Sequence, residues 1–151
     1  MGTRSRIGVM HGDNLKSVYC HWDGYLDHNG RILLNHYDSS KANFLVALGD
    51  LSSLREEIGE KHDFADSGAD NRQCTFYGRD RGEEGVGWLV HENFENFMEQ
   101  CEAQGVEYYY IMRDGVWYVG TTYGSDAVLG HKLVSLAEAL ADHDIQNAEQ
   151  V

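Results

Sequence analysis

The segment from residue 91 to residue 105 has the clearest helical periodicity in the chain. Four apolar side chains recur there at i, i+3, i+4 and i+7: Phe94, Phe97, Met98 and Cys101. Such a stripe is typical of a helix that buries one face. Gly105 follows the stripe, at the place where a glycine commonly ends a helix. We therefore expect an amphipathic helix in this segment.

Turn residues between β-rich segments predict two hairpins. Residues 5–11 and 15–22 flank the turn sequence "GDN" and are rich in residues that favour strands. Residues 106–113 and 116–122 flank Asp114-Gly115, a pair that suits the two positive φ angles of a type I′ turn. Large side chains occupy both faces of this second hairpin. Either both faces are covered, or one forms an interface, for example with a second copy of the chain.

The rest of the chain predicts further helices and one more strand. The first helical segment is residues 28–37, with Asp27 as N-cap, and the second is residues 40–48, which Ser39 or Ser40 opens and Gly49 closes. The third is residues 52–60, where Ser53 and Glu56 have the spacing of a capping box. The fourth is residues 131–143, with apolar residues on one side: Leu133, Leu136, Ala137 and Leu140. Residues 61–73 have the composition of a loop, and "CTFYGRDR" at 74–81 is expected to form a strand.

Together these elements predict the α+β class. We expect an antiparallel sheet of about five strands, made of two hairpins plus one strand, with three to four helices packed on it. Residues 1–143 are expected to form a single domain, and residues 144–151 a frayed C-terminal tail.

Composition supports a packed, water-soluble domain. The chain has 151 residues, of which 42% are hydrophobic, which fits a buried core better than disorder. No apolar run approaches the roughly 20 residues of a membrane-spanning helix, and the first residues lack the apolar stretch of a signal peptide. We expect a cytoplasmic protein.

The net charge of −13 is concentrated in the second half of the chain. Residues 82–151 contain 13 acidic side chains and two lysines or arginines. This charge disfavours binding to nucleic acid or to an anionic membrane. It leaves open a basic protein partner, or mimicry of a nucleic-acid surface.

Motifs for catalysis or cofactor binding are missing from the sequence. The three cysteines, Cys20, Cys74 and Cys101, form no CxxC pair, so we expect free and mostly buried thiols. There is no GxSxG, HExxH or GxxxxGK[ST] motif. We therefore assign no catalytic residue and no cofactor.

The dense stretch "VYCHWDGYLDHNG" at residues 18–30 is the first candidate site. In a regular strand, Val18, Cys20 and Trp22 would share one face, and Tyr19, His21 and Asp23 would share the other. A metal site would then rest on His21 and Asp23, with His28 or His36 as a third ligand. Alternatively, the histidine and the aspartate are simply hydrogen-bonded at a strand end, where the chain turns at Gly24.

The same alternation predicts a shared outer face on three strands. Its members would be Arg4 and Arg6 from the first strand, Tyr19, His21 and Asp23 from the second, and Tyr77, Arg79 and Arg81 from the segment 74–81. Arginines bind phosphate or carboxylate in a bidentate manner, and tyrosines offer a flat surface to a base or sugar. If the strands are neighbours, this face predicts a site for a small, nucleotide-like anion. The alternative is a set of solvated arginines paired with nearby carboxylates.

A second candidate surface is an acidic stripe on the helix around residues 92–104. Its members follow 3, 4, 3 spacing: Glu92, Glu95, Glu99 and Glu102. Like-charge pairs at this spacing disfavour the helix slightly. The stripe is either a solvated face or a docking surface for a basic partner.

Four segments resemble a family of short hypothetical proteins encoded mainly by tailed phages, with relatives in bacterial genomes. They are "TRSRI", "VYCHWDGYLDHNGRILLNHY", "LVALGDLSSLREEIG" and "CTFYGRDRGE", between Thr3 and Glu84. The resemblance implies action inside an infected bacterium, on a host protein or on a nucleotide signal, and it supplies no catalytic residues.

Three functions are therefore considered. The first is non-enzymatic binding of a small anionic ligand by the arginine and tyrosine face. The second is an acidic inhibitor that docks a basic host protein through the glutamate stripe. The third is a metal-dependent hydrolase that uses His21, Asp23 and His28.

Overall fold

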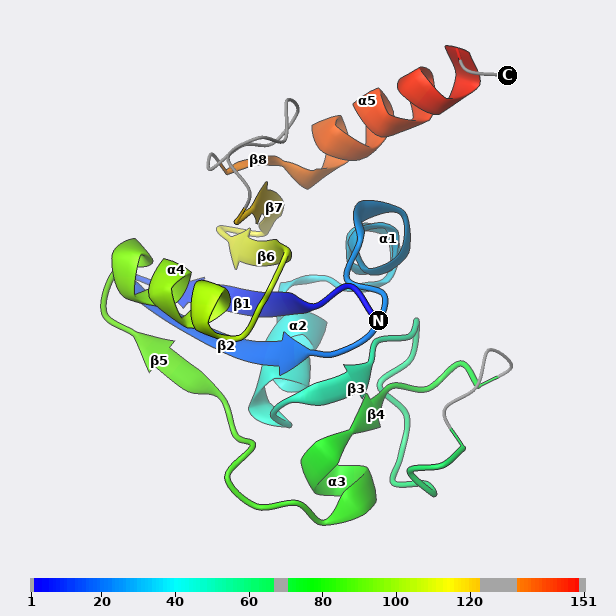
Figure 1. The fold of residues 1–151 in the computed structure, drawn as a ribbon, viewed down its shortest axis with the longest axis vertical. Helices are drawn as coiled ribbons and strands as arrows, with labels where there is room; N and C mark the ends of the chain where they lie inside the picture. Colours follow the sequence, from blue (N-terminus) through cyan, green and yellow to red (C-terminus); the bar gives the residue numbers. More distant parts are fainter. Residues whose placement is uncertain (1, 67–70, 123–132, 150–151) are drawn as a thin grey trace.

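One mixed β-sheet organises the described part of the chain, residues 2–66, 71–122 and 133–149 of the computed structural model (Figure 1). Its eight strands are β1 (Ser5–His11), β2 (Asn14–Cys20), β3 (Leu51–Ser53), β4 (Thr75–Phe76), β5 (Leu89–His91), β6 (Tyr108–Arg113), β7 (Val116–Thr121) and β8 (Val134–Ser135). Their order is β4-β3-β2-β1-β6-β7-β8, and β5 pairs with β2.

Both predicted hairpins are confirmed. β1 and β2 pair antiparallel, as do β6 and β7. At the second turn, Asp114 has φ 53° and Gly115 has φ 79°, which are the positive angles that a type I′ turn requires.

The α+β class is also confirmed, but the antiparallel five-stranded sheet is wrong. β1 runs parallel to β6, with Ile7 opposite Tyr110, and β2 runs parallel to β3. Parallel neighbours need long crossover connections. These connections come from helices that the sequence predicted, but hydrophobic periodicity did not reveal how the strands are ordered.

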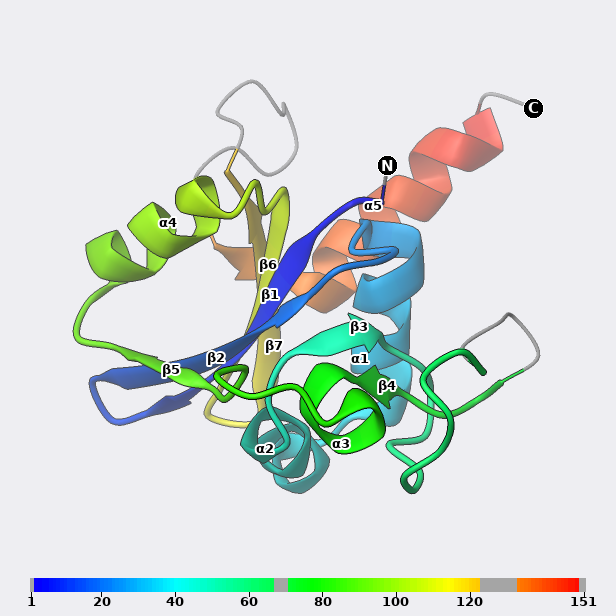
Figure 2. The same ribbon diagram turned by 60° about the horizontal axis from the view of Figure 1, so that its bottom comes forward.

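Helices cover both faces of the sheet. They are the π-helix η1 (Leu26–Gly30) and the α-helices α1 (Arg31–His36), α2 (Ser39–Ala47), α3 (Tyr77–Arg81), α4 (Phe94–Ala103) and α5 (Leu136–Glu149). Figure 2 shows α4 on one side of β6 and β7, with α1 and α5 on the other side.

Each face of the sheet carries its own apolar core. On one face, Ile7, Tyr110 and Trp117 pack with residues of α1, α2 and α5. On the other face, Tyr109 and Ile111 pack with Phe97 and Cys101 of α4. The chain's own helices therefore cover both faces of the β6–β7 hairpin, and Phe97 and Cys101 confirm the predicted apolar stripe.

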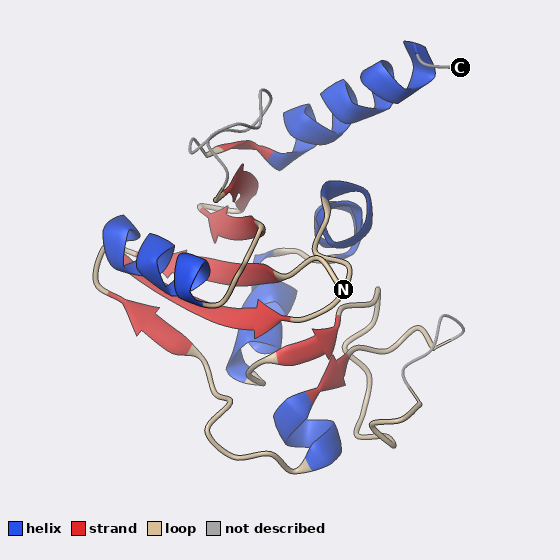
Figure 3. Cartoon of the chain, in the orientation of Figure 1, coloured by secondary structure: helices blue, strands red, loops and turns tan. Residues whose placement is uncertain are grey.

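Two predicted elements are wrong around α3. The predicted helix at 52–60 is strand β3 followed by irregular backbone, and the predicted strand at 74–81 is the short β4 followed by helix α3. The strand stops because the Asp80 carboxylate accepts a hydrogen bond from Phe76 N at 2.7 Å. Figure 3 shows that loop forms most of the connection between β3 and β4.

The ends of two other helices differ from the sequence expectation. Asp27 lies inside the π-helix η1 and is not an N-cap; the cap position is Tyr25. Helix α5 starts at Leu136 and continues to Glu149. Asp144, at the start of the expected frayed tail, pairs with Arg31 at 2.8 Å. None of the helices in the described residues has the length and apolar character needed to cross a membrane.

Candidate functional site

Arg6, predicted to contact a ligand, is buried with 1% of its surface exposed. Its guanidinium donates to Ser17 Oγ at 2.9 Å, to the Ser17 carbonyl at 3.1 Å and to Gln104 Oε1 at 2.6 Å. Burial lowers the pKa of Arg6, and these neutral acceptors give the buried guanidinium three hydrogen bonds. Arg6 therefore joins β1 to β2 and to the end of α4. The strand alternation predicted that Arg6 would face solvent, and this prediction is wrong.

The Arg6 network extends to His91 on β5, a link that sequence reasoning missed. Ser17 Oγ lies 2.7 Å from His91 Nε2. Burial and then the charge of Arg6 lower the pKa of His91 to about 4. Although serine and histidine can form a nucleophilic pair, the Ser17 side chain is fully buried. This pair therefore holds strands together.

Arg79, also predicted to bind a ligand, lies in α3 and points into the protein. It donates to Asp80 Oδ1 at 3.0 Å, and to the carbonyls of Ile58 at 2.9 Å and Cys74 at 2.8 Å. The Asp80 side chain is 0% exposed. Burial acts to raise its pKa, but hydrogen bonds from Arg79 and from backbone N–H groups lower it overall. Because α3 is helical, the strand alternation assumed for Tyr77, Arg79 and Arg81 is wrong.

Arg81 stays at the surface beside aromatic rings. Its guanidinium lies 4.9 Å from the centre of the Tyr77 ring and pairs with Glu83. Its side chain is 48% exposed. Of the two predicted α3 arginines, only Arg81 remains open to solvent.

We call four of the predicted residues the Tyr19 surface: Arg4, Tyr19, His21 and Tyr77. Tyr19 Oη lies 2.8 Å from His21 Nδ1. Burial raises the pKa of Tyr19, and the positive charge of Arg4 offsets part of this increase. Burial and the charge of Arg4 also lower the pKa of His21. Arg4 and Tyr77 both influence the pKa of Tyr19, and the Arg4 guanidinium donates to the Gln104 carbonyl at 3.2 Å; ligand binding by these residues stays a prediction.

Asp23 and His28 belong to a tight connection between β2 and α1. Asp23 adopts a left-handed backbone with φ 57°, so strand alternation ends before it. His28 Nδ1 lies 2.9 Å from Asn29 Oδ1. The buried Asn29 amide donates to Ser5 Oγ and to the Trp22 carbonyl. These contacts explain much of the dense stretch as structural.

The structure does not support the predicted metal site. The described residues contain no group of three or more histidine, cysteine, aspartate or glutamate side chains placed to hold a metal ion. His21, Asp23 and His28 therefore do not form the cluster that the sequence suggested, because the left-handed turn and η1 separate them.

All three cysteines are free and buried, as expected. Burial raises the pKa of Cys20 and of Cys101 to about 12. It also raises the pKa of Cys74, which the Tyr37 hydroxyl contacts at 3.2 Å. A thiolate is the reactive form of cysteine, so these thiols are poor nucleophiles.

The acidic stripe is exposed, but it is shorter than predicted. Helix α4 begins at Phe94 after its N-cap Asn93, so Glu92 precedes the helix. Glu95, Glu99 and Glu102 are exposed along it. Docking of a basic partner on these residues stays a prediction.

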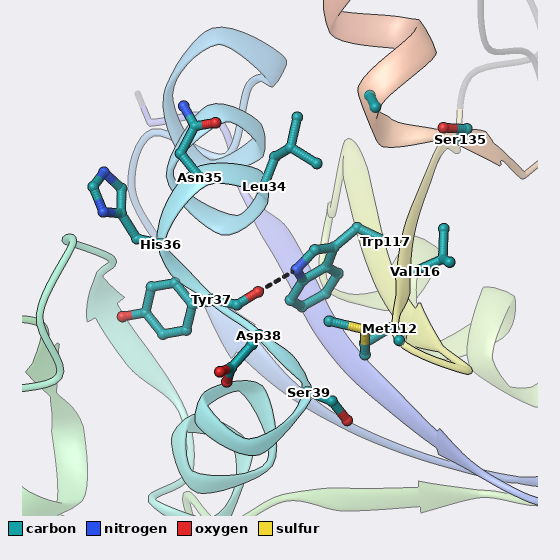
Figure 4. A pocket seen from close by; sticks show the side chains of 12 residues that line it. Leu34, Asn35, His36, Tyr37, Asp38, Ser39, Met112, Val116, Trp117 and Ser135 are labelled. Atoms are coloured by element: carbon teal, nitrogen blue, oxygen red, sulfur yellow. Dashed lines mark hydrogen bonds between the residues drawn. The ribbon is translucent and has the colours of Figure 1, made fainter.

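A cleft of about 670 Å³ opens where the α1–α2 junction meets the β6–β7 hairpin and the start of α5 (Figure 4). The residues that line it are Leu34, Asn35, His36, Tyr37, Asp38, Ser39, Met112, Gly115, Val116, Trp117, Ser135 and Ala137. Trp117 Nε1 donates to the Tyr37 carbonyl at 2.9 Å, which ties the hairpin to the junction. This volume lies within the usual range for small-molecule sites.

The cleft combines an apolar floor with polar groups at two helix starts. Trp117 and Met112 are 4% and 3% exposed. Asp38 caps α2 by accepting from Lys41 N at 2.8 Å, and Ser135 Oγ accepts from Glu138 N at 3.4 Å. Among the described residues, no lysine or arginine lines the cleft. Its chemistry therefore suits a neutral or cationic ligand better than an anion.

Sequence reasoning missed this cleft. Asp38 and Ser39 before an apolar run are a recognisable helix start, so one wall could have been found. That Trp117 meets this wall depends on contacts between residues 80 positions apart. No family model matches the chain, and no solved structure matches it significantly.

Replacing Arg79 by glutamine is expected to destabilise the protein. The buried Asp80 carboxylate would lose its cationic partner, a change that costs about 3 kcal/mol in buried ion pairs. Arg81→Gln is the matched control, since its exposed ion pair is worth about 0.5 kcal/mol. Urea unfolding of both variants checks this. Equal stability of the two would contradict the structural role of Arg79.

Acid is expected to weaken the fold through His91. Its folded pKa of about 4 lies below the unfolded value of about 6.5. As the pH falls from about 6.5 to about 4, the unfolded chain therefore binds more protons, and the free energy of unfolding drops by up to about 3 kcal/mol. Urea unfolding across this pH range should show a flatter profile for His91→Gln than for the exposed His11→Gln. Identical profiles for both variants would contradict the expectation.

Proposed function

We propose that the protein is a non-enzymatic binding protein that holds a small ligand in the cleft between α1, α2 and the β6–β7 hairpin. The observation that carries this proposal is the lining of the cleft, where the apolar residues Trp117 and Met112 and the polar residues Asp38 and Ser135 line the same space. Ligand sites typically join an apolar surface to a few polar groups that fix orientation. The resemblance to phage proteins implies that this binding takes place inside an infected bacterium.

The lining favours a flat, neutral molecule with hydroxyl groups, such as a nucleoside. Val116, which is 45% exposed, and the partly exposed Leu34 offer an apolar surface to a ring. Asp38 is an acceptor for hydroxyl groups, and Ser39 and Ser135 can donate or accept. A phosphate would meet the Asp38 carboxylate, and the described lining residues include no lysine or arginine to balance it. Adenosine should therefore bind more tightly than AMP.

Filling the cleft should weaken this binding. Ala137 is exposed on α5 and lines the cleft, so Ala137→Phe places a ring in the ligand's space. We expect adenosine binding to weaken at least about tenfold, measured by isothermal titration calorimetry. Ala141→Phe is the matched control, because Ala141 is exposed on the same helix and does not line the cleft. Equal binding by both variants, or no binding of any nucleoside by the wild type, would reject the proposal.

A second candidate keeps the predicted small anion and uses the Tyr19 surface. It is supported by the proximity of Arg4 to Tyr19 and His21, and by the exposed Arg81 beside Tyr77. Arginine would bind a phosphate, and a tyrosine ring would stack on a base.

The second candidate makes the opposite prediction about phosphate. AMP should bind more tightly than adenosine, and Arg4→Gln should remove that preference, with a loss of about tenfold. Arg72→Gln serves as the control because Arg72 is exposed and pairs with Glu56. Calorimetry with both ligands separates the two sites, since Ala137→Phe should leave AMP binding unchanged. Retention of the AMP preference in Arg4→Gln would exclude the Tyr19 surface.

A further inference from the structure

A separate cavity of about 240 Å³ lies on the opposite face of the sheet, beside the start of α4. Its apolar walls include Leu15, Phe94, Ile111 and Leu133, and its charged members are Asp13 and Arg113. We call it the α4 cavity. It is smaller than the roughly 300 Å³ at which drug-sized ligand sites begin, so only a compact ligand would fit.

The strand register builds the floor of the α4 cavity. Met10 pairs across β1 and β2 with Leu15, and Ile111 pairs across β6 and β7 with Tyr118. Leu15 and Ile111 are 3% and 2% exposed. Phe94, at the first position of α4, is 40% exposed and packs near Tyr109 with ring centres 5.8 Å apart. A ligand there would be held by a dry apolar floor and one aromatic wall.

Two opposite charges line the same cavity. Asp13 lies in the β1–β2 turn, and Arg113 lies at the end of β6, which runs parallel to β1 with Val9 opposite Met112. The Arg113 guanidinium lies 4.7 Å from the centre of the Tyr118 ring. Within the described ranges, no ion pair of 4.0 Å or less involves Asp13 or Arg113. Neither charge is therefore neutralised by an ion pair within the part of the chain that the structure describes.

We propose that the α4 cavity binds a small zwitterion with an apolar side chain, that is, an α-amino acid such as leucine, methionine or phenylalanine. Arg113 forms a bidentate pair with the carboxylate. Asp13 accepts hydrogen bonds from the ammonium group. The side chain enters the space between Leu15, Ile111 and Phe94, where burial of apolar surface favours binding. This site is independent of the cleft and of the Tyr19 surface.

The α4 cavity can be tested with probes that remove one charge at a time. L-Phenylalanine, L-leucine and L-methionine are titrated by calorimetry at millimolar concentrations. 3-Phenylpropionate lacks the ammonium group, phenethylamine lacks the carboxylate and glycine lacks the apolar side chain. We expect at least one of the three amino acids to bind, and each incomplete probe to bind at least about tenfold more weakly.

Two variants test the role of each charged side chain in binding the amino acid. Arg113→Gln and Asp13→Asn should each weaken binding of the amino acid by about tenfold. Both positions are exposed, so neither change is expected to unfold the protein. Arg72→Gln and Asp142→Asn are matched controls at exposed positions outside the α4 cavity, and Ala137→Phe tests independence from the cleft. All three controls should bind as the wild type does.

Three results would overturn the proposal. The first is no detectable heat with any of the three amino acids. The second is equal affinity for phenylalanine and 3-phenylpropionate, which would remove the role of Asp13. The third is unchanged affinity in Arg113→Gln, which would mean that the carboxylate is held elsewhere or not at all.

Discussion

The parallel pairing of β1 with β6 joins the half of the sheet that contains β2, β3 and β4 to the half that contains β7 and β8. The position of both cavities depends on this pairing. Ile7 lies opposite Tyr110, and Glu107 N donates to the Arg4 carbonyl at 2.9 Å. This register directs Met112 and Trp117 of the β6–β7 hairpin toward the cleft, and Ile111 and Arg113 toward the α4 cavity. Because side chains alternate along a strand, a slip of one residue would exchange the two linings.

Buried arginines hold together the elements around that sheet. Arg6 joins β1, β2 and α4 through neutral acceptors, whereas Arg79 joins α3 to the preceding loop through Asp80 and backbone carbonyls. A guanidinium removed from water needs such partners, since an unsatisfied charge in the interior is very unfavourable. The guanidinium groups of Arg6 and Arg79 thus lie inside the protein, whereas acidic side chains such as those of α4 are exposed. This arrangement explains why two of the four predicted ligand arginines are structural.

Features governed by neighbouring residues could be read from the sequence. The two hairpins, helix α4 with its end near Gly105, and the buried free cysteines all follow from local turn chemistry or apolar periodicity. The segment 74–81 was misread because its alternation fits a strand, although Asp80 caps the backbone at Phe76 and turns the chain into α3. Two predicted residues, Tyr19 and His21, do meet, because they lie two positions apart at the end of β2 and just after it.

Local patterns were therefore enough for the α+β class, for most helices and for the two hairpins, since turn chemistry and side-chain period act over a few residues. They were not enough for the sheet order, for the burial of Arg6 and Arg79, or for either cavity. Trp117 reaches Tyr37, and Asp13 and Arg113 line one cavity, only because β1 and β6 are paired across about a hundred residues of chain. Contacts at that separation depend on how whole elements pack, which no short stretch of this sequence encodes.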